Sequence, residues 1–450
     1  MTKKAYFIGI GGIGMSAIAR YYKHEGYEVA GYDRTPSPLT AELEKEGINI
    51  HYTDSINNIP AQFKSQDTFV IYTPAIPADS EELNYFRTSG NNPMKRSAVL
   101  GHIAKTKKVL AVAGTHGKTT TSTLLAHLMV ETAGGCTAFL GGISKNYNSN
   151  LLLSNNEWMV AEADEYDRSF LQLYPYIAAV TSADADHLDI YGTGEELKRT
   201  FGEFVSQINP QGALVLKKNV TIPLEKASCK IYSYAYNDTS ADFYAYNIEL
   251  KKGFYQFDIH TPFSEITNCT LGLPGWVNVE NAVAAVAVTI LAGGDKDKVS
   301  KALSTFTGVV RRFDVQINTP EHVYIDDYAH HPEELTAAIT SVKQMFPNRK
   351  VTGVFQPHLY TRTRDFADEF AKSLSLLDRL ILLDIYPARE LPIEGVTSKI
   401  IFDNVTIPDK QMISKDQLMD VLKTTDFDVL VTLGAGDIDR FVKPITEMLK

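Results

Sequence analysis

Residues 107–133 read KKVLAVAGTHGKTTTSTLLAHLMVETA. The apolar stretch 109–113 predicts a strand, the following glycine-rich residues predict a loop, and the stretch after Lys118 predicts a helix. A loop between a strand and a helix suits a nucleoside triphosphate, because loop N–H groups and the helix N-terminus surround the phosphates. The sequence therefore predicts a P-loop for ATP in an α/β protein.

The predicted ATP-binding loop departs from the full pattern G-x-x-x-x-G-K-[ST], because Val112 stands where the first glycine belongs. Lys118 is expected to meet the β- and γ-phosphates, and Thr119 to bind the accompanying metal ion. A surface lysine in a glycine-rich turn is the alternative, which the flanking strand and helix disfavour. The predicted ATP-binding residues of the loop are Gly114, Thr115, His116, Gly117, Lys118, Thr119 and Thr120.

Strand-like and helix-like segments alternate on both sides of this loop. Near the N-terminus, apolar stretches alternate with helical patterns, and the same alternation returns between residues 323 and 441. This order is typical of α/β folds with parallel sheets. The N-terminal segments are 5–11, 15–26, 27–33, 40–47 and 68–73.

The middle of the chain adds a different pattern. Residues 230–272 alternate polar and apolar side chains with period two, which predicts antiparallel strands. Residues 279–294 predict a buried helix that ends at glycine. A length of 450 residues exceeds one hydrophobic core and suggests roughly two to four domains. The three successive α/β stretches lead us to predict three. They are a Rossmann-like domain (1–106), a central P-loop ATPase-type domain with an added antiparallel β region (107–313), and a C-terminal Rossmann-like α/β domain (314–450).

The composition excludes several classes of protein. A hydrophobic fraction of 44% and a charged fraction of 22% are ordinary for a folded soluble chain. A net charge of -10 argues against nucleic-acid binding, which needs clustered Lys and Arg. Cys136, Cys229 and Cys269 lie too far apart in sequence to suggest a disulfide framework or a zinc site. No signal peptide or membrane-spanning stretch is visible, so we expect a cytoplasmic protein without membrane insertion.

A second glycine-rich loop lies near the N-terminus. Residues 9–14 read GIGGIG between a predicted strand and a predicted helix, and Asp33 ends the next strand. Taken alone, this fingerprint favours a nicotinamide dinucleotide. The pyrophosphate of a UDP-sugar suits the same loop equally well, and a tight turn without a ligand is the remaining alternative. Two phosphate loops suit an enzyme that brings ATP to a second nucleotide better than a simple dehydrogenase.

Acidic and histidine residues follow two further predicted strands, where α/β enzymes bind ligands. Glu162 ends the strand at 158–161, and its carboxylate suits Mg²⁺. His187 follows the strand near 180, and it suits Mn²⁺ or a hydrogen-bonding role better than Mg²⁺. Each acidic residue taken singly could be a solvated loop residue, so only the joint arrangement favours a metal–ATP site.

Several of these segments together resemble the Mur ligases, over essentially the whole chain. The segments are GTHGKTTT (114–121), EADEYDRSF (162–170), DADHLDIY (184–191) and DDYAHHP (326–332). The resemblance implies that Lys118 is catalytic and that Thr119, Glu162 and His187 hold divalent ions. It also implies that Asn278, Asn281 and Arg312 bind ATP, and that Asp327 and His330 of the third domain are catalytic, with the deprotonation of the amine assigned to one of them. The alternative for His330 and His331 is that they cap the helix that follows them.

The resemblance also implies the roles of the outer domains. The N-terminal domain is expected to bind the UDP-substrate and the C-terminal domain the amino acid. The predicted UDP-substrate residues are Gly11, Gly12, Ile13, Gly14, Asp33 and Thr73, and the predicted amino-acid residues are Tyr328, His358 and Arg362. The implied cofactors are ATP and Mg²⁺, with Mn²⁺ as the alternative ion. We expect a monomer or a weak homodimer.

Four further segments are most similar to the branch of the family that joins L-alanine to the carboxylate of UDP-N-acetylmuramic acid through an acyl phosphate, in peptidoglycan synthesis. They are 9–19, 356–366, 384–396 and 433–438. A ligase that recycles a murein tripeptide is the second possibility, and an NAD-dependent oxidoreductase is a more remote one. Trp276-Val277 replaces the usual Arg-His pair, Leu359 replaces an arginine, and Phe201 replaces a lysine that is carbamylated in sister ligases, so no carbamate is expected.

Overall fold

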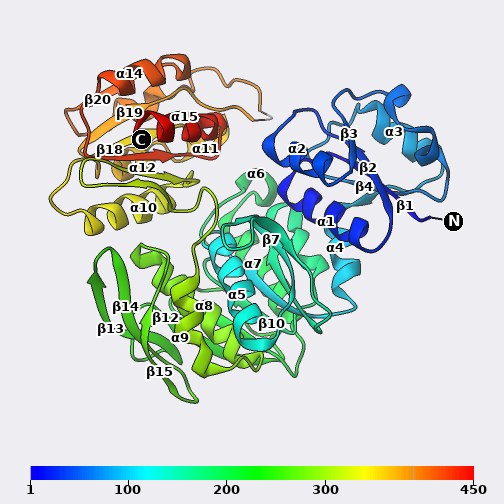
Figure 1. Cartoon of the computed structure of the whole chain (residues 1–450), viewed down its shortest axis with the longest axis horizontal. Coiled ribbons are helices and arrows are strands. Elements are labelled where there is room, and N and C mark those ends of the chain that lie inside the picture. Colours follow the sequence, from blue (N-terminus) through cyan, green and yellow to red (C-terminus); the bar gives the residue numbers. More distant parts are fainter. Residues whose placement is uncertain (1, 389) are drawn as a thin grey trace. The chain divides into compact units, whose positions relative to one another are not determined.

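The computed structural model describes residues 2–388 and 390–450, apart from the side chains of residues 188 and 189. Helices are interleaved with the strands of three sheets (Figure 1), so the predicted α/β class is confirmed. The chain forms two compact units. One comprises the residues up to 247 together with 257–269 and 280–306, and the other comprises 248–256, 270–279 and 307–450.

The N-terminal sheet has the strand order β3-β2-β1-β4-β5, and its neighbouring strands pair in parallel. Successive residues of β1 alternate between two buried clusters, Ala5 and Phe7 on one face and Tyr6 and Ile8 on the other. This sheet places the loop after β1 at its carboxyl edge. The elements are β1 (Lys4–Ile8), α1 (Ile13–His24), β2 (Glu28–Tyr32), α2 (Pro38–Lys45), β3 (Asn49–His51), η1 (Ile56–Asn58), η2 (Ala61–Lys64), β4 (Phe69–Tyr72), α3 (Glu81–Thr88), β5 (Met94–Lys95) and α4 (Arg96–Ala104).

The central sheet has the order β15-β14-β13-β12-β11-β10-β6-β9-β7-β8. Strand β6 pairs in parallel with both β9 and β10, so the carboxyl ends of these three strands meet at one edge. Its first elements are β6 (Lys108–Ala113), α5 (Lys118–Ala133), β7 (Thr137–Ser144), β8 (Ser149–Leu152), β9 (Trp158–Ala163), η3 (Tyr166–Gln172), β10 (Ile177–Val180), α6 (Leu188–Tyr191) and α7 (Gly194–Ser206). The remaining elements are β11 (Ala213–Lys217), β12 (Lys230–Ala235), β13 (Phe243–Lys251), β14 (Phe254–His260), β15 (Glu265–Thr270), α8 (Trp276–Leu291) and α9 (Lys296–Thr305).

The prediction for residues 230–272 is correct for the strands and partly wrong for their direction. Strand β12 pairs in parallel with β11 and with β13, whereas we expected antiparallel strands throughout. Period-two alternation identifies a strand but carries no information about the direction of its neighbour. Between β13 and β14, Lys252 and Gly253 both have positive φ, the geometry of a tight hairpin turn. The predicted buried helix is α8.

The C-terminal sheet has the order β16-β17-β21-β18-β19-β20, with β16 antiparallel at one edge and the other pairs parallel. Helices α10 and α12 contribute to one buried cluster, and α14 and α15 to another on the opposite face (Figure 1). The elements are β16 (Asp314–Asn318), β17 (Val323–Asp327), α10 (Pro332–Met345), β18 (Val351–Phe355), α11 (Tyr360–Asp365), α12 (Ala367–Leu374), β19 (Arg379–Leu382), α13 (Lys399–Phe402), β20 (Lys410–Met412), η4 (Lys415–Gln417), α14 (Leu418–Thr424), β21 (Val429–Leu433), η5 (Asp437–Phe441) and α15 (Val442–Met448).

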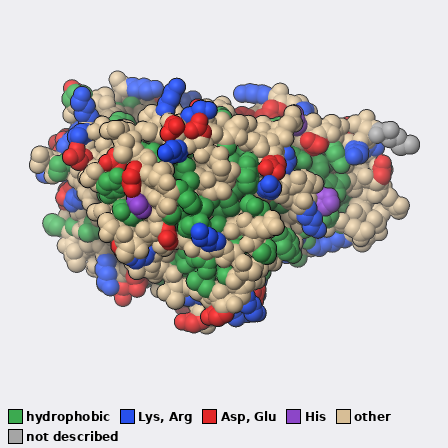
Figure 2. All heavy atoms as spheres, turned by 90° about the horizontal axis from the view of Figure 1, so that it is seen from below, with side chains coloured by type: hydrophobic (Ala, Val, Ile, Leu, Met, Phe, Trp, Pro, Cys, Tyr) green, Lys and Arg blue, Asp and Glu red, His purple; other side chains and the backbone are tan. Residues whose placement is uncertain are grey.

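The surface mixes charges of both signs. Figure 2 shows Lys and Arg interspersed with Asp and Glu on the face in view. The described residues include no helix with the length and apolar character needed to cross a bilayer. All three cysteines are free thiols, and Cys136 and Cys269 are buried.

Candidate active site

The loop between β6 and α5 requires glycine at two positions. Gly114 and Gly117 have φ values of 139° and 80°, which L-residues with side chains rarely adopt. A Cβ at Gly114 would lie 2.2 Å from Oγ1 of Thr181, and one at Gly117 would lie 2.9 Å from Oδ1 of Asn281. The loop therefore packs closely against the strand end after β10 and against α8, and the predicted ATP residue Asn281 lies beside it.

Two hydroxyl groups after β10 hold this loop. The N–H of His116 donates to Oγ of Ser182 at 2.7 Å, and Oγ1 of Thr181 donates to the carbonyl of His116 at 2.5 Å. Thr115 also donates to Oγ of Ser182 at 3.0 Å. This role of Thr181 and Ser182 could not be predicted from the sequence, because it depends on two strands that are adjacent only in the folded sheet.

Helix α5 begins directly at the loop. Its N-cap is Gly117, and no described side chain caps it. The first N–H groups of an α-helix lack partners within the helix and carry a partial positive charge, so they suit an anion. The loop thus lies between a strand and the N-terminus of a helix, and its assignment to a triphosphate stays a prediction.

Lys118 is the first residue of α5, and its side-chain ammonium group contacts several oxygen atoms. Its Nζ is 2.8 Å from Oε2 of Glu165 and 2.6 Å from the carbonyl oxygen of Gly114. Burial by itself lowers the pKa of a lysine, but the neighbouring carboxylates, Glu165 foremost, raise the pKa of Lys118 above its usual value. Lys118 is therefore a fixed cation at the start of the helix.

Glu165 is fully buried and links Lys118 to His187. Nε2 of His187 lies 3.5 Å from Oε1 of Glu165. Burial raises the pKa of a carboxyl group, but Lys118 and His187 outweigh it and lower the pKa of Glu165. Tyr191 also donates to the backbone carbonyl of Glu165 at 2.5 Å. The sequence placed Glu165 near the site without giving it a role, because its partners are distant along the chain.

Thr119 and Glu162 meet at the edge of the sheet. Oγ1 of Thr119 donates to Oε1 of Glu162 at 3.2 Å. On the other side, a Cβ at Gly141 of β7 would lie 2.1 Å from Oε2 of Glu162, so only glycine leaves room for this carboxylate. A hydroxyl and a carboxylate beside a phosphate loop are hard oxygen donors that fit Mg²⁺, which otherwise keeps water and substrate phosphates as ligands.

His187 belongs to a neighbouring group rather than to this oxygen pair. Its Nε2 lies 3.5 Å from Glu165 and 3.8 Å from Oδ2 of Asp186, and its φ is 52°. Of the three predicted metal residues, Thr119 and Glu162 thus form one pair, whereas His187 lies beside Glu165, which was not predicted as a ligand. The described residues contain no cluster of three or more His, Cys, Asp or Glu side chains arranged to hold a metal ion by themselves.

The N-terminal glycine loop is held by two of its predicted residues. The N–H of Gly11 donates to Oδ2 of Asp33 at 2.8 Å. Gly9 has a φ of 86°, and a Cβ there would lie 2.5 Å from Cγ2 of Thr73. In this structure Asp33 and Thr73 therefore support the loop itself. Helix α1 follows with Gly12 as its N-cap and without a capping bond from any described side chain.

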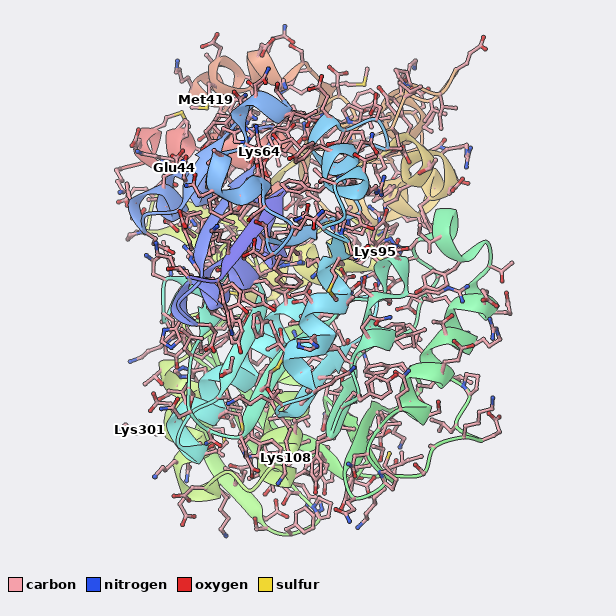
Figure 3. All side chains as sticks on the ribbon, turned by 90° about the vertical axis from the view of Figure 1, so that its right-hand side faces the viewer. Glu44, Lys64, Lys95, Lys108, Lys301 and Met419 are labelled. Atoms are coloured by element: carbon pink, nitrogen blue, oxygen red, sulfur yellow. The ribbon has the colours of Figure 1, made fainter. Side chains whose placement is uncertain are left out.

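Arg96, which the sequence did not single out, lies beside this loop. A Cβ at Gly14 would approach Nη1 of Arg96 to 2.7 Å, and Nη2 of Arg96 lies 3.5 Å from Oδ2 of Asp164. The adjacent Lys95, which is labelled in Figure 3, forms an ion pair with Asp167 at 3.0 Å. A basic side chain at the start of α4 thus connects the N-terminal loop to the 162–170 segment, a relationship that sequence spacing does not reveal.

Asn278, another predicted ATP residue, lies in the first turn of α8, where its Nδ2 donates to the carbonyl of Pro274 at 2.6 Å. Arg312 lies in the second unit, with its guanidinium 4.6 Å from the ring centre of Tyr328. This distance is within cation–π range. Tyr328 therefore contacts a predicted ATP residue as well as the predicted amino-acid site.

Asp327 ends strand β17 in the second unit. Its carboxylate accepts the N–H groups of Phe313 and Ala329, each at 2.7 Å. Burial raises its pKa to about 6, although Arg312 and these N–H groups act in the opposite direction. Asp327 is therefore poised to exchange a proton close to neutral pH.

The two neighbouring histidines have different environments. His331 is the N-cap of α10, and its Nδ1 accepts the N–H of Glu333 at 3.4 Å, so the capping alternative holds for His331. Nδ1 of His330 instead lies 3.0 Å from the carbonyl of Tyr328 and 3.2 Å from Oε2 of Glu334. His330 also packs edge-on against the ring of His358.

His358 and Arg362 lie at the carboxyl edge of the same sheet. Nη1 of Arg362 lies 3.5 Å from Nδ1 of His358, and the ring of Tyr386 stacks on His358. Leu359, which stands where an arginine is usual, has a φ of 69°, a strained conformation for a residue with a side chain. The predicted amino-acid residues Tyr328, His358 and Arg362 thus lie close to His330 in one connected group.

Comparison with known families finds three successive domain models along the chain. Residues 4–108 match the Mur ligase family catalytic domain, residues 112–289 the Mur ligase middle domain, and residues 311–436 the Mur ligase glutamate ligase domain. The chain belongs to the Mur ligase family. The exact domain boundaries predicted from the sequence remain a prediction.

This Mur ligase has relatives of known name along its full length. It is 54% identical to a UDP-N-acetylmuramate–L-alanine ligase of Parabacteroides distasonis over 99% of this chain and 96% of the relative. It is 48% identical to the enzyme of that name from Flavobacterium johnsoniae, over 99% and 98%. The crystal structure of UDP-N-acetylmuramate–alanine ligase from Thermotoga maritima matches this structure with a TM-score of 0.84, 28% identity and 99% coverage of both chains.

Proposed function

We propose that this Mur ligase joins L-alanine to the lactyl carboxylate of UDP-N-acetylmuramic acid, with conversion of ATP to ADP and phosphate. The observation that carries the proposal is the presence of two glycine-rich phosphate loops in one unit, each at the start of an uncapped helix. Full-length relatives that carry the name of this ligase support the same reaction. The product would enter peptidoglycan synthesis, and we propose the cytoplasm as its place of action.

We assign ATP to the loop 114–120 and the UDP-sugar to the loop 9–14. In this assignment Lys118 contacts the β- and γ-phosphates and Arg96 contacts the pyrophosphate of the UDP-sugar. Both side chains are cations beside a helix N-terminus, which is where phosphate oxygens are expected. Asn278, Asn281 and Arg312 are proposed to complete the ATP site, and Asp33 and Thr73 to support the UDP loop.

The first chemical step activates the sugar carboxylate. A carboxylate oxygen attacks the γ-phosphorus of ATP, the bond from that phosphorus to the bridging oxygen breaks, and ADP leaves with the electron pair. The product is an acyl phosphate. Lys118 stabilises the charge of the transferring phosphoryl group, because it stays protonated beside Glu165 and needs no rearrangement of solvent.

The second step forms the amide bond. The amine of alanine attacks the acyl carbon, and the resulting tetrahedral intermediate expels phosphate. The incoming ammonium must first lose a proton, and Asp327 or His330 is the proposed acceptor. Arg362 is the proposed partner of the alanine carboxylate, since a guanidinium can hold a carboxylate by two parallel hydrogen bonds.

We propose Mg²⁺, with Mn²⁺ as the alternative, at the oxygen pair of Thr119 and Glu162. His187 is proposed to serve a second ion or to hydrogen-bond beside Glu165. A divalent ion at this place would neutralise phosphate charge during phosphoryl transfer. The residues themselves position the phosphates through the loop N–H groups and Lys118.

The second candidate is the ligase that recycles a murein tripeptide. A murein peptide ligase of Psychrobacter arcticus shares the fold with a TM-score of 0.71 at 22% identity, which is a likeness of fold alone. The test is phosphate release with ATP and UDP-N-acetylmuramic acid against a panel of amino acids and the tripeptide. The proposal expects release with L-alanine. Release with the tripeptide in preference to alanine would replace it by the recycling reaction.

A further inference from the structure

A buried asparagine joins the central sheet to the phosphate-binding helix of the N-terminal region. Asn150 of β8 is fully buried. Its Nδ2 donates to the carbonyl of Ile13 at 2.6 Å and to Oγ of Ser16 at 2.9 Å. Its Oδ1 accepts a hydrogen bond from Nη1 of Arg20 at 2.5 Å. Both the Nδ2 and the Oδ1 of the amide therefore have hydrogen-bond partners, and all three partner residues belong to α1.

These contacts fall on the turn that follows the N-terminal glycine loop. Ile13 is the first residue of α1, and Ser16, itself fully buried, donates to the same carbonyl of Ile13 at 2.9 Å. The carbonyl of Ile13 thus accepts hydrogen bonds from two side chains, and one of them comes from a different sheet. Because the free N–H groups of this turn face the proposed pyrophosphate, the position of the turn decides where that ligand sits.

Arg20 extends the connection to α2. Its Nε and Nη2 donate to Oε1 of Glu46 at 2.9 and 2.6 Å. Since Arg20 contacts Asn150 and Glu46 together, α1 and the C-cap residue of α2 are connected to the same strand of the central sheet.

The partner strand of β8 reaches the proposed ATP site. Strand β7 pairs antiparallel with β8 and parallel with β9. It carries Gly141, the residue whose missing side chain leaves room for the carboxylate of Glu162. The hairpin β7–β8 therefore makes two contacts. Asn150 of β8 binds the first turn of α1, and Gly141 of β7 packs against the proposed metal carboxylate of Glu162.

We propose that Asn150 is a positioning residue that holds the UDP-sugar loop at a fixed place relative to the ATP site. It acts through the backbone of α1 and is not assigned a contact with either nucleotide. The inference rests on the proposed function only in the identity of the ligand, because the hydrogen bonds to Ile13 and Ser16 exist without it. Loss of the amide should displace the first turn and weaken the capture of the pyrophosphate.

The test compares Asn150→Ala with Asn156→Ala. Asn156 is a matched control, because its Nδ2 also donates to a helix carbonyl, that of Ala133 at the end of α5, at 3.0 Å. Asn150→Ala should raise the KM for UDP-N-acetylmuramic acid about five- to thirtyfold with a smaller change in the KM for ATP, the range expected for lost hydrogen bonds. Asn156→Ala should leave both values near those of the unmodified protein. Ser16→Ala, which removes one of the two acceptors, should give an intermediate result.

Hydrogen exchange supplies a readout that needs no catalysis. Asn150→Ala should speed exchange of the backbone amides of residues 13–17, whereas Asn156→Ala should not. Equal exchange in this turn, or a KM for the UDP-sugar that changes no more than in Asn156→Ala, would overturn the inference. Failure of the unmodified protein to bind the UDP-sugar would instead contradict the proposed function, and the exchange experiment would still decide the role of Asn150. If Asn150→Ala does not fold, Ser16→Ala carries both measurements.

Discussion

Nζ of Lys118 lies 2.8 Å from Oε2 of Glu165, a carboxylate with no exposed surface. The pair fixes a charged lysine at the start of α5, where the proposed triphosphate binds. A buried pair of this kind owes much of its apparent strength to the penalty that either charge suffers alone. Substitutions of one partner and of both therefore separate the structural role of the pair from its role in catalysis.

Lys118→Met should abolish ligation and also destabilise the protein, by about 3–5 kcal/mol, because Glu165 is left as a buried charge without its lysine partner. The double variant Lys118→Met/Glu165→Gln should recover most of that stability and none of the activity. Urea unfolding and phosphate release measure the two effects. Calorimetry should show that both variants still bind the UDP-sugar. Turnover restored in the double variant would mean that Lys118 does not serve the phosphates.

Arg96→Ala should raise the KM for the UDP-sugar by about ten- to a hundredfold and change the KM for ATP little, since a charged donor to phosphate is lost. Gly14→Val and Gly14→Ala should act in the same direction, because the added carbon lies where Nη1 of Arg96 now approaches. Steady-state kinetics of the single variants and of the double variant Gly14→Ala/Arg96→Ala test this. If Gly14→Ala raises the KM for the UDP-sugar by the same factor in the Arg96→Ala enzyme as in the unmodified enzyme, the two effects are independent. Crowding of Arg96 is then not the reason why Gly14→Ala weakens binding.

The raised pKa of Asp327 predicts that catalysis depends on pH. If Asp327 is the base that accepts the amine proton, kcat/KM should fall below about pH 6, where this carboxyl group becomes protonated. Glu82 of α3 in the first unit is the control, because burial raises its pKa to about 7. Glu82→Gln should leave the acid limb of the pH–rate profile in place. If the acid limb disappears in Glu82→Gln, then Glu82 and not Asp327 causes it.

The same raised pKa predicts how stability changes with pH. The folded protein binds the Asp327 proton more tightly than the unfolded chain, whose aspartates titrate near pH ~3.9. The contribution of Asp327 to stability is therefore fully present below about pH 4 and is lost as the pH rises through about 6. Asp327→Asn should remove this decline from the urea unfolding of the C-terminal region, followed by a local probe. A decline of unchanged size in the variant would show that another group causes it.

Arg362→Lys should raise the KM for L-alanine by about ten- to a hundredfold, because a point charge cannot replace the planar fork of a guanidinium. Arg364→Lys on the same helix is the matched control, since Arg364 is exposed and pairs with the adjacent Asp365. Competition kinetics should also place glycine and L-serine below L-alanine by about ten- to two-hundredfold in kcat/KM, because glycine lacks the methyl group of alanine and serine adds a hydroxyl to it. Equal kinetics for the two lysine variants would rule out Arg362 as the carboxylate anchor.

The sequence was informative where a local pattern determines the structure. The strand β6, its glycine loop and α5 follow one another without interruption, so apolar period, glycine spacing and helix propensity all point to the same element. The direction in which β12 pairs could not be predicted, because the side-chain alternation of a strand is the same for parallel and antiparallel neighbours.

The site residues that the sequence missed are those that act across long separations in the chain. Glu165 is 47 residues from Lys118, and Arg96 reaches Gly14 only after the N-terminal sheet has formed. His331 shows a different limit, because histidine is an uncommon N-cap and the pair His330-His331 gives no sign of which residue caps the helix. Only the backbone geometry of α10 distinguishes the two.

In the proposed reaction, ATP activates the sugar carboxylate before alanine attacks it. The most direct measurement uses UDP-N-acetylmuramic acid labelled with a heavy oxygen isotope in its lactyl carboxylate, together with ATP and L-alanine. Formation of an acyl phosphate transfers one carboxylate oxygen to the departing phosphate, so the released phosphate should carry the label and the product should be extended by one alanine. Unlabelled phosphate, with the label retained wholly in the sugar product, would contradict the proposed reaction.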